Sequence, residues 1–327
     1  MKDHEKRHCT MNFSKYIGCI SLVMVIYMLS TLCTNESDKQ HKYRWHGPIP
    51  LIPSYPPSQR VADACNGVAS RLFFLTYGND RFVQSKERIR KEAESWQIFD
   101  DIIIDSPRTL SPTFRYRFRD ILAIPGGGGR YFWKLYIIHR MLQRMVNGDF
   151  VMYVDSGCSM DLVSNFTNYK VFGTCPPREK RMREAPHLIS YLLGHIHHLC
   201  SHNATETLDI VAHYHPWALN TDERYASNAI YEYLNASVHP NQRSIVSTYY
   251  TIRKSPISMA VWDALMRIMD KNASLWLREY NDNQTRAVRT QFQYTQTQTI
   301  PSIFLRTLGY NVPTHLKPAA YACRIRT

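Results

Sequence analysis

The residues best suited to do chemistry lie in a short turn that directly follows an apolar run. Residues 150–154 read F-V-M-Y-V, and Asp155, Ser156 and Gly157 come next. An apolar run of this length, closed by turn residues, predicts a buried strand. Open sheets of parallel strands bind ligands outside the carboxyl ends of those strands, so Asp155 is a candidate site residue. The alternative is an aspartate that only begins a solvated surface turn.

The elements that must position this turn can be read from the surrounding pattern. Residues 72–76 and 101–105 are short apolar runs that predict strands, and residues 85–96 between them have a helical pattern of charges. A strand, a helix and a strand at this spacing predict a parallel α/β sheet. Residues 132–145 predict a further amphipathic helix, which ends just before the strand that leads to the acid.

The composition of the 327-residue chain excludes several classes of protein. With 44% hydrophobic residues, 13 glycines and 8 cysteines, it is not a disordered polymer, a collagen-like repeat or a small disulfide-rich domain. A mean hydropathy of −0.37 with a single long apolar stretch excludes a multi-span membrane protein. The net charge of +13 is not accompanied by a recognition-helix or base-stacking motif, so we expect no nucleic-acid partner.

The single long apolar stretch, residues 16–33, predicts a membrane anchor. It carries no charge and would span about 27 Å as a helix. More basic than acidic residues precede it, so the positive-inside rule leaves residues 1–15 in the cytosol and the rest of the chain in the lumen. Residues 34–65 contain five prolines and predict a stem without a helix, and residues 66–327 predict one lumenal domain. A cleaved signal peptide is the alternative.

Two other features agree with a lumenal position. Five cysteines follow the anchor, an odd number without a Cys-x-x-Cys pair, which permits one or two disulfides and disfavours a zinc ribbon. Six acceptors for N-glycosylation, Asn-x-Ser/Thr, also follow the anchor. They are Asn35, Asn165, Asn203, Asn235, Asn272 and Asn283.

Three segments together resemble a known family. They are F-L-T-Y-G-N-D at residues 74–80, R-Y-F-W-K-L-Y-I-I-H-R-M-L at residues 130–142, and G-D-F-V-M-Y-V-D-S-G-C at residues 148–158. Over residues 71–157 the chain resembles nucleotide-sugar glycosyltransferases of the GT-A type, and within them a group with W-K-P-Y-I-I and D-A-G-C motifs. The resemblance implies a GT-A-like α/β/α sandwich with a mostly parallel sheet, preceded by one transmembrane helix. It also implies a single-pass type II protein of the Golgi or ER membrane.

The activity that this resemblance implies is transfer of a sugar from a nucleotide-sugar donor to a glycan, protein or lipid acceptor. Such transfer needs the charge of the leaving diphosphate to be balanced, commonly by Mn²⁺ or Mg²⁺ held on carboxylates. By resemblance, Asp155 holds that metal and acts in catalysis, and Gly157 lets the backbone approach the diphosphate. The other donor-binding residues that the resemblance implies are Thr76, Tyr77, Gly78 and Lys134. The alternative for Lys134 is a surface lysine whose stem lies along its own helix.

A later segment also resembles the group. Thr297-Gln298-Thr299-Ile300 stands where the group has D-Q-S-I, which implies a catalytic role for Gln298 and leaves Thr297 in place of the acid. Gly157 likewise stands where many GT-A enzymes carry the second acid of Asp-x-Asp. Acids that could substitute are Asp209, Asp222, Glu223 and Asp282. These departures leave an alternative function, a non-catalytic relative that binds a glycan or a protein partner.

Histidines offer two further metal hypotheses. His315, in the segment T-H-L-K-P, resembles a late metal-binding histidine of some GT-A families and is the second predicted metal ligand. His198 and His202 have the one-turn spacing of a zinc site. No H-E-x-x-H motif is present, however, and partly exposed histidines explain such a pair more simply.

Overall fold

The structure is a computed structural model that divides into two units, Met1–Ser54 and Tyr55–Thr327. It describes residues 57–124, 129, 131–160, 170–172, 187–214, 221, 222, 226, 228–237, 242–276, 296–320 and 324–326, all in the second unit. The predicted tail, the predicted anchor and most of the predicted stem lie outside the described residues. Within the described ranges, no helix combines the length and apolarity needed to cross a membrane.

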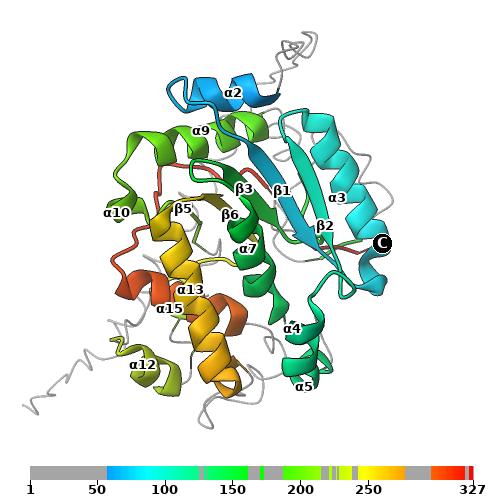
Figure 1. Cartoon of the computed structure of the whole chain (residues 1–327), viewed down its shortest axis with the longest axis vertical. Helices are drawn as coiled ribbons and strands as arrows, with labels where there is room; N and C mark the ends of the chain where they lie inside the picture. The colour runs from blue at the N-terminus through cyan, green and yellow to red at the C-terminus, as the bar shows by residue number, and fades with distance from the viewer. Residues whose placement is uncertain are drawn as a thin grey trace, which may run out of the picture. The chain divides into compact units, whose positions relative to one another are not determined.

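The second unit contains a five-stranded sheet in the order β2-β1-β3-β6-β5 (Figure 1). Its strands are β1 (Leu72–Tyr77), β2 (Asp101–Asp105), β3 (Phe150–Val154), β5 (Ile210–Val211) and β6 (Tyr249–Arg253). β1 pairs in parallel with β2 and β3, whereas β6 runs antiparallel to both of its neighbours. The expected mostly parallel α/β sheet is confirmed, with β6 as the reversed strand. A separate antiparallel pair joins β4 (Lys170–Phe172) to β7 (Arg324–Arg326).

Helices cover both faces of the sheet. They are α2 (Pro57–Ala64), α3 (Val83–Trp96), α4 (Pro112–Arg117), α5 (Arg119–Leu122), α7 (Trp133–Arg144), α9 (Leu188–Ser201), α10 (Ala204–Thr207), α12 (Asn228–Leu234), α13 (Pro256–Lys271) and α15 (Gln296–Thr307), with 3₁₀ turns at Asp80–Phe82 and Ala273–Trp276. Because successive strand residues point to opposite faces, Phe73 and Leu75 pack with α7 and α13, while Leu72 and Phe74 pack with α3 and α9. Figure 1 shows the positions of these four helices.

The local sequence explains most of these elements. The five segments expected from pattern alone, at residues 72–76, 85–96, 101–105, 132–145 and 150–154, are observed as β1, α3, β2, α7 and β3. α13 begins with a capping box in which Ser255 and Ser258 bond each other's backbone amides, and Pro256 occupies the first helical position. Gly148 follows α7 with φ +96°, a conformation that favours glycine at the turn into β3.

The helix α2 corrects the expected boundary of the stem. Residues 34–65 were expected to hold no helix, yet Pro57–Ala64 is helical and packs against α9. Pro57 lies at the first position of the helix, where a missing amide hydrogen removes no internal hydrogen bond. The adjoining Cys65 forms a disulfide with Cys200 at the end of α9. The folded unit therefore begins before residue 66.

Candidate active site

The candidate site is built on the turn that follows β3. The amide of Cys158 donates to the Asp155 carbonyl at 2.8 Å, which closes a four-residue turn. The Asp155 amide donates to the Thr248 carbonyl at 2.9 Å, just before β6 begins. Asp155 thus stands where the apolar pattern predicts it, at the carboxyl end of β3. The carboxyl ends of β1 and β2 lie at the same edge of the sheet.

Lys134 reaches this acid from α7 and forms an ion pair with it. Lys134 Nζ lies 2.9 Å from Asp155 Oδ1 and 3.1 Å from Oδ2, and it donates to the Ser247 carbonyl at 2.9 Å. The Lys134 side chain is 2% exposed and that of Asp155 is 20% exposed. The surface-lysine alternative is therefore wrong. α7 packs on the face of the sheet to which Tyr153 points. Asp155 comes two residues after Tyr153 and points to the same face, so Lys134 of α7 can reach it.

Aromatic side chains complete the surroundings of this ion pair. Lys134 Nζ lies 5.3 Å from the ring centre of Tyr131 and 5.5 Å from that of Tyr153, within cation–π range. The Tyr153 hydroxyl donates to Asp155 Oδ1. Burial first, and then the charge of Asp155, hold the pKa of Tyr153 well above its ordinary value. The phenol therefore stays protonated and continues to donate to the carboxylate.

The predicted donor-binding residues of β1 lie at the same edge, but two of their side chains are buried. The Tyr77 ring is stacked on Trp133, the neighbour of Lys134, with ring centres 3.6 Å apart. Thr76 is fully buried, and its Oγ1 has no hydrogen-bond partner within the described residues. At Gly78 an added Cβ would lie 2.8 Å from Lys86 Cγ, which leaves little room for a side chain. Contact of these residues with a donor stays a prediction.

Gly157 is not required by the protein around it. Its φ lies outside the left-handed region, and a Cβ added there would meet no atom within 4 Å. Gly129 is different, because its φ is +81° and an added Cβ would lie 2.7 Å from the Ile121 carbonyl oxygen. Neither the backbone nor the packing of the described residues needs glycine at position 157. Among the described residues, no atom fills the space that a Cβ at position 157 would enter.

Residues 297–300, which resemble the D-Q-S-I segment, belong to α15, and this helix reaches the edge of the sheet at which Asp155 lies. Gln298 lies in the first turn of this helix, and Ser302 one turn later accepts a hydrogen bond from the Ile245 amide at 2.8 Å. Ile245 lies two residues before Ser247, which bonds Lys134. The structure thus places Gln298 on an element that borders the site. Within the described residues, no hydrogen bond or ion pair joins Gln298 to Asp155.

The acids proposed as substitutes lie at different ends of the sheet. Asp222 accepts a hydrogen bond from Ser302 of α15 and forms an ion pair with Arg306. It therefore lies at the same edge of the sheet as the candidate site, but its charge is already balanced by Arg306. The carbonyl of Asp209 accepts from the Arg253 amide, and Arg253 pairs with the first residue of β3. Asp209 therefore lies at the opposite edge from Asp155 and cannot replace the missing acid. Glu223 and Asp282 lie outside the described residues.

The two predicted metal ligands do not meet. The His315 ring is centred 5.4 Å from that of His198, near the end of α9 where the Leu199 carbonyl accepts from Arg253. Arg253 pairs with the first residue of β3, whereas Asp155 follows the last. His315 thus belongs to the opposite edge of the sheet. Within the described ranges, no three histidine, cysteine or acidic side chains are grouped so that they could hold a metal ion, and the zinc alternative at His198 and His202 falls under the same result.

The residues around Asp155 do not fit a protein-held Mn²⁺ or Mg²⁺. Such an ion prefers one or two carboxylates with free oxygen lone pairs. Here both oxygens of Asp155 face the ammonium of Lys134, and Oδ1 also accepts from Tyr153. A divalent cation at this carboxylate would lie close to a buried positive charge, so we assign no step to a metal.

Several partners of the site carry no signal in the amino-acid order. Tyr153 reads only as one member of an apolar strand, and Ser247 lies in an irregular segment before β6. Asp105, the last residue of β2, is paired with Arg140 of α7 at 2.6 Å, so the acid at the end of that strand is also compensated. These pairs join elements that are far apart along the chain.

Three predicted N-glycosylation acceptors lie in the described ranges. Asn203 and Asn235 are exposed, and Asn272 is half-buried at the end of α13. The Asn203 side-chain oxygen accepts from the Thr205 amide at 3.1 Å, which leaves its nitrogen available. Asn165 and Asn283 lie outside the described residues.

Comparison with known proteins gives few matches. No family model and no curated protein sequence matches the chain. A solved structure similar to it is that of glucosyl-3-phosphoglycerate synthase from Mycobacterium tuberculosis in complex with Mn²⁺, UDP-glucose and phosphoglyceric acid. The similarity covers 86% of this chain and 95% of that one, with 12% sequence identity and a TM-score of 0.34. Similarity at this level does not establish a common fold, so no property of that enzyme is transferred to this chain.

Proposed function

We propose that the chain is a glycosyltransferase that binds a nucleotide sugar at the carboxyl edge of its sheet. The observation that carries this proposal is the ion pair between Lys134 and Asp155. Lys134 comes from the W-K segment and Asp155 from the D-S-G segment, and both segments resemble the same transferase group. They approach within 2.9 Å at the edge where sheets of this class bind ligands.

The geometry suggests separate tasks for the two charged groups. Asp155 is the more exposed of the two, so its carboxylate is the group that a donor would contact, by accepting hydrogen bonds from sugar hydroxyls. Lys134 is buried, and together with Tyr153 it fixes the orientation of that carboxylate. Gly157 leaves room for the diphosphate to approach the turn. In the reaction the acceptor oxygen forms a bond to the anomeric carbon while the bond from that carbon to the diphosphate oxygen breaks. The nucleoside diphosphate leaves and takes up the proton of the acceptor hydroxyl.

We also propose that the domain works in the lumen of the Golgi or ER, attached through the predicted helix at residues 16–33. The disulfide between Cys65 and Cys200 supports an oxidising compartment, because disulfides are rare in the cytosol. The exposure of Asn203 and Asn235 is compatible with glycosylation there. The glycan, protein or lipid that accepts the sugar is part of this proposal only as a class.

The test is a donor panel on the full chain. UDP-glucose, UDP-galactose, UDP-N-acetylglucosamine and GDP-mannose would each be titrated by calorimetry, with Mn²⁺ and with EDTA, and donor hydrolysis would be measured in parallel. We expect one of them to bind and Asp155→Asn to weaken that binding at least roughly tenfold, as for a lost charged hydrogen-bond acceptor. Asp120→Asn is the control, because the Asp120 side chain is 93% exposed and lies on α5.

Two outcomes would overturn the proposal. A chain that binds and hydrolyses none of the four donors is not a nucleotide-sugar transferase of this kind, and the non-catalytic glycan-binding or protein-binding alternative then takes its place. Equal binding by the wild type and Asp155→Asn would remove Asp155 from the site. The EDTA arm separately tests whether a divalent cation brought by the donor is needed.

A further inference from the structure

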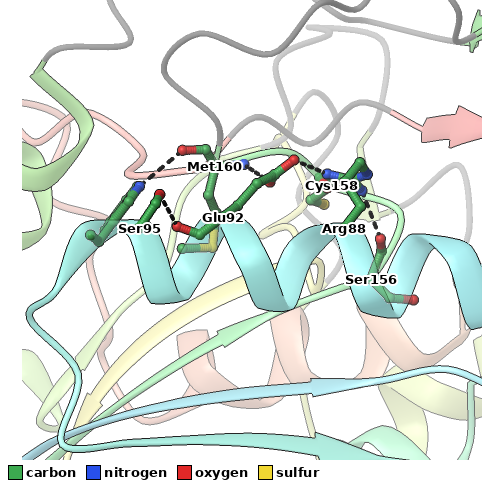
Figure 2. Close-up of polar contacts among 7 residues, drawn as sticks. Arg88, Glu92, Ser95, Ser156, Cys158 and Met160 are labelled. Atoms are coloured by element: carbon green, nitrogen blue, oxygen red, sulfur yellow. Dashed lines mark hydrogen bonds and ion pairs between the residues drawn. The ribbon is translucent and has the colours of Figure 1, made fainter.

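The turn that carries Asp155 is held from the far side of the sheet by α3. Figure 2 shows Arg88 and Glu92 of this helix reaching the segment from Ser156 to Met160. Arg88 Nη2 donates to the Ser156 carbonyl at 3.0 Å and to the Cys158 carbonyl at 2.6 Å. The Met160 amide donates to Glu92 Oε2 at 2.7 Å. These two side chains thus make three hydrogen bonds to the backbone of one five-residue segment.

The two side chains that make these bonds are themselves an ion pair. Arg88 and Glu92 pair with each other one helical turn apart, and their side chains are only 8% and 5% exposed. Trp96, a further turn along, donates from its indole nitrogen to the Met160 carbonyl at 3.1 Å. Placing two charges in a buried position is costly and is weak evidence for a gain in stability. What this pair provides is a defined backbone conformation in the segment that it holds.

The point of attachment explains why a defined conformation is needed. The two carbonyls that bond Arg88 belong to Ser156 and Cys158, the residues on either side of Gly157. Glycine has the largest backbone freedom, and at Gly157 no atom of the described residues lies within 4 Å of where a Cβ would be. A single guanidinium that bonds both flanking carbonyls restricts the backbone angles of Gly157. The same turn is closed by the hydrogen bond from Cys158 to the Asp155 carbonyl, so the restraint extends to the acid.

We propose that Arg88 and Glu92 are positioning residues for the donor site. They act through the backbone of the Asp155–Met160 turn and set the orientation of the Asp155 carboxylate and the opening beside Gly157. Lys134 holds the acid from one face of the sheet, and Arg88 holds its turn from the other. This inference rests on the proposed function for its effect on a donor, but the conformational part of it can be tested without any donor.

The experiment compares Arg88→Lys with Arg90→Lys on the full chain. Lysine keeps the charge, but it has one nitrogen in place of the two with which Arg88 bonds Glu92 (Nη1) and the carbonyls of Ser156 and Cys158 (Nη2). Arg90 is the matched control, because it lies on the same helix, pairs with Glu87 and is 46% exposed. Hydrogen exchange of the amides in residues 155–160 is measured first. We expect exchange there to speed up at least roughly tenfold in Arg88→Lys and to be unchanged in Arg90→Lys.

Donor binding is then measured in two backgrounds, with the panel member that the wild type binds. We expect Arg88→Lys to weaken binding roughly tenfold in the wild type and less than about threefold in Asp155→Asn, because residues that act through one another are not additive. A purely structural role would give the same loss in both backgrounds and would overturn the inference. If Arg88→Lys does not fold, Glu92→Gln is used in the same design. It removes the charge that pairs with Arg88 but retains an acceptor for the Met160 amide.

The two proposals fail in different ways. If no donor binds the wild type, the proposed function fails while the exchange measurement still decides the role of Arg88. If a donor binds but exchange in residues 155–160 is the same in Arg88→Lys and the wild type, the positioning role is wrong and the proposed function stands.

Discussion

Replacing Asp155 should lower the free energy of unfolding more than replacing Lys134, although both substitutions break the same ion pair. Removing one partner of a buried pair costs about 3–5 kcal/mol, because the other charge remains buried. Asp155→Asn removes the counter-charge of the Lys134 ammonium, whose side chain is 2% exposed. Only neutral partners remain: the acceptors of Ser247, the amide oxygen of the new asparagine and the rings of Tyr131 and Tyr153. We expect a loss of about 3 kcal/mol, the lower end, because the 20% exposure of Asp155 already screens the pair in the wild type.

The opposite substitution should be milder. Lys134→Met leaves Asp155 with the Tyr153 hydroxyl and with access to water, and the methionine fills the space of the lysine stem. We expect a loss of about 1 kcal/mol, the usual size of one net hydrogen bond. The double variant has no unpaired charge, so it should lie within about 1 kcal/mol of Lys134→Met alone, which makes it more stable than Asp155→Asn.

The assay is urea unfolding of the full chain at pH 7, followed by tryptophan fluorescence. Asp120→Asn on α5 is the control for loss of an exposed acid and should change the unfolding free energy by less than about 0.5 kcal/mol. Equal losses for Asp155→Asn and Lys134→Met would refute the reasoning, because they would mean that the two charges are equally hydrated. An additive double variant would refute it too, because it would mean that the charges do not interact.

Three further predictions follow from other features of the structure. Gly157→Ala should leave the urea midpoint unchanged, because an added Cβ meets no atom of the described residues within 4 Å. If the diphosphate approaches this turn, the same substitution should weaken binding of the panel donor at least roughly fivefold in calorimetry, and unchanged binding would mean that the ligand lies elsewhere. Burial lowers the pKa of His213 from 6.5 to about 4, so its contribution to stability is complete above pH 6.5 and is lost as the pH falls toward 4, by about 3 kcal/mol in total. Between pH 7 and pH 4 the free energy of unfolding should therefore fall less steeply for His213→Asn than for the wild type, and equal slopes would contradict this prediction. Cys200→Ser removes the disulfide to Cys65, which is 135 residues away, and should lower the unfolding free energy by about 4–5 kcal/mol. Wild-type protein reduced with dithiothreitol should lose the same amount. A smaller loss would mean that the reduced chain keeps α2 in place.

The strands β1, β2 and β3 and the helices α3 and α7 could be predicted because their signals are local, whereas β6 and α13 were not predicted. β1, β2 and β3 are short apolar runs closed by turn residues, and the amphipathic pattern of α7 spans only a few turns. The position of Asp155 follows from the same reasoning, because it is simply the first residue after a strand. The helix α2 was missed because prolines dominate its neighbourhood, and the α9 surface against which it packs is far away in the sequence.

The side-chain pairs of the site could not be predicted, and α3 shows the reason. Arg90 with Glu87 and Arg88 with Glu92 are charged pairs of nearly the same spacing on one helix, and nothing in the local sequence distinguishes them. The first pair is about half exposed, whereas the second is buried and bonds the turn beyond β3. Which pair faces inward depends on how the helix is rotated against the sheet, and no local pattern of charges records that rotation.

From the order of amino acids alone follow the parallel α/β class, the strand that ends at Asp155 and the family whose motifs it resembles, because these depend on neighbours along the chain. The tertiary structure decided that Lys134 faces inward and meets Asp155, that His315 lies at the other edge of the sheet, and that Arg88 holds the turn. Electrostatic pairs form only over a few ångströms, so they depend on how distant segments pack against one another.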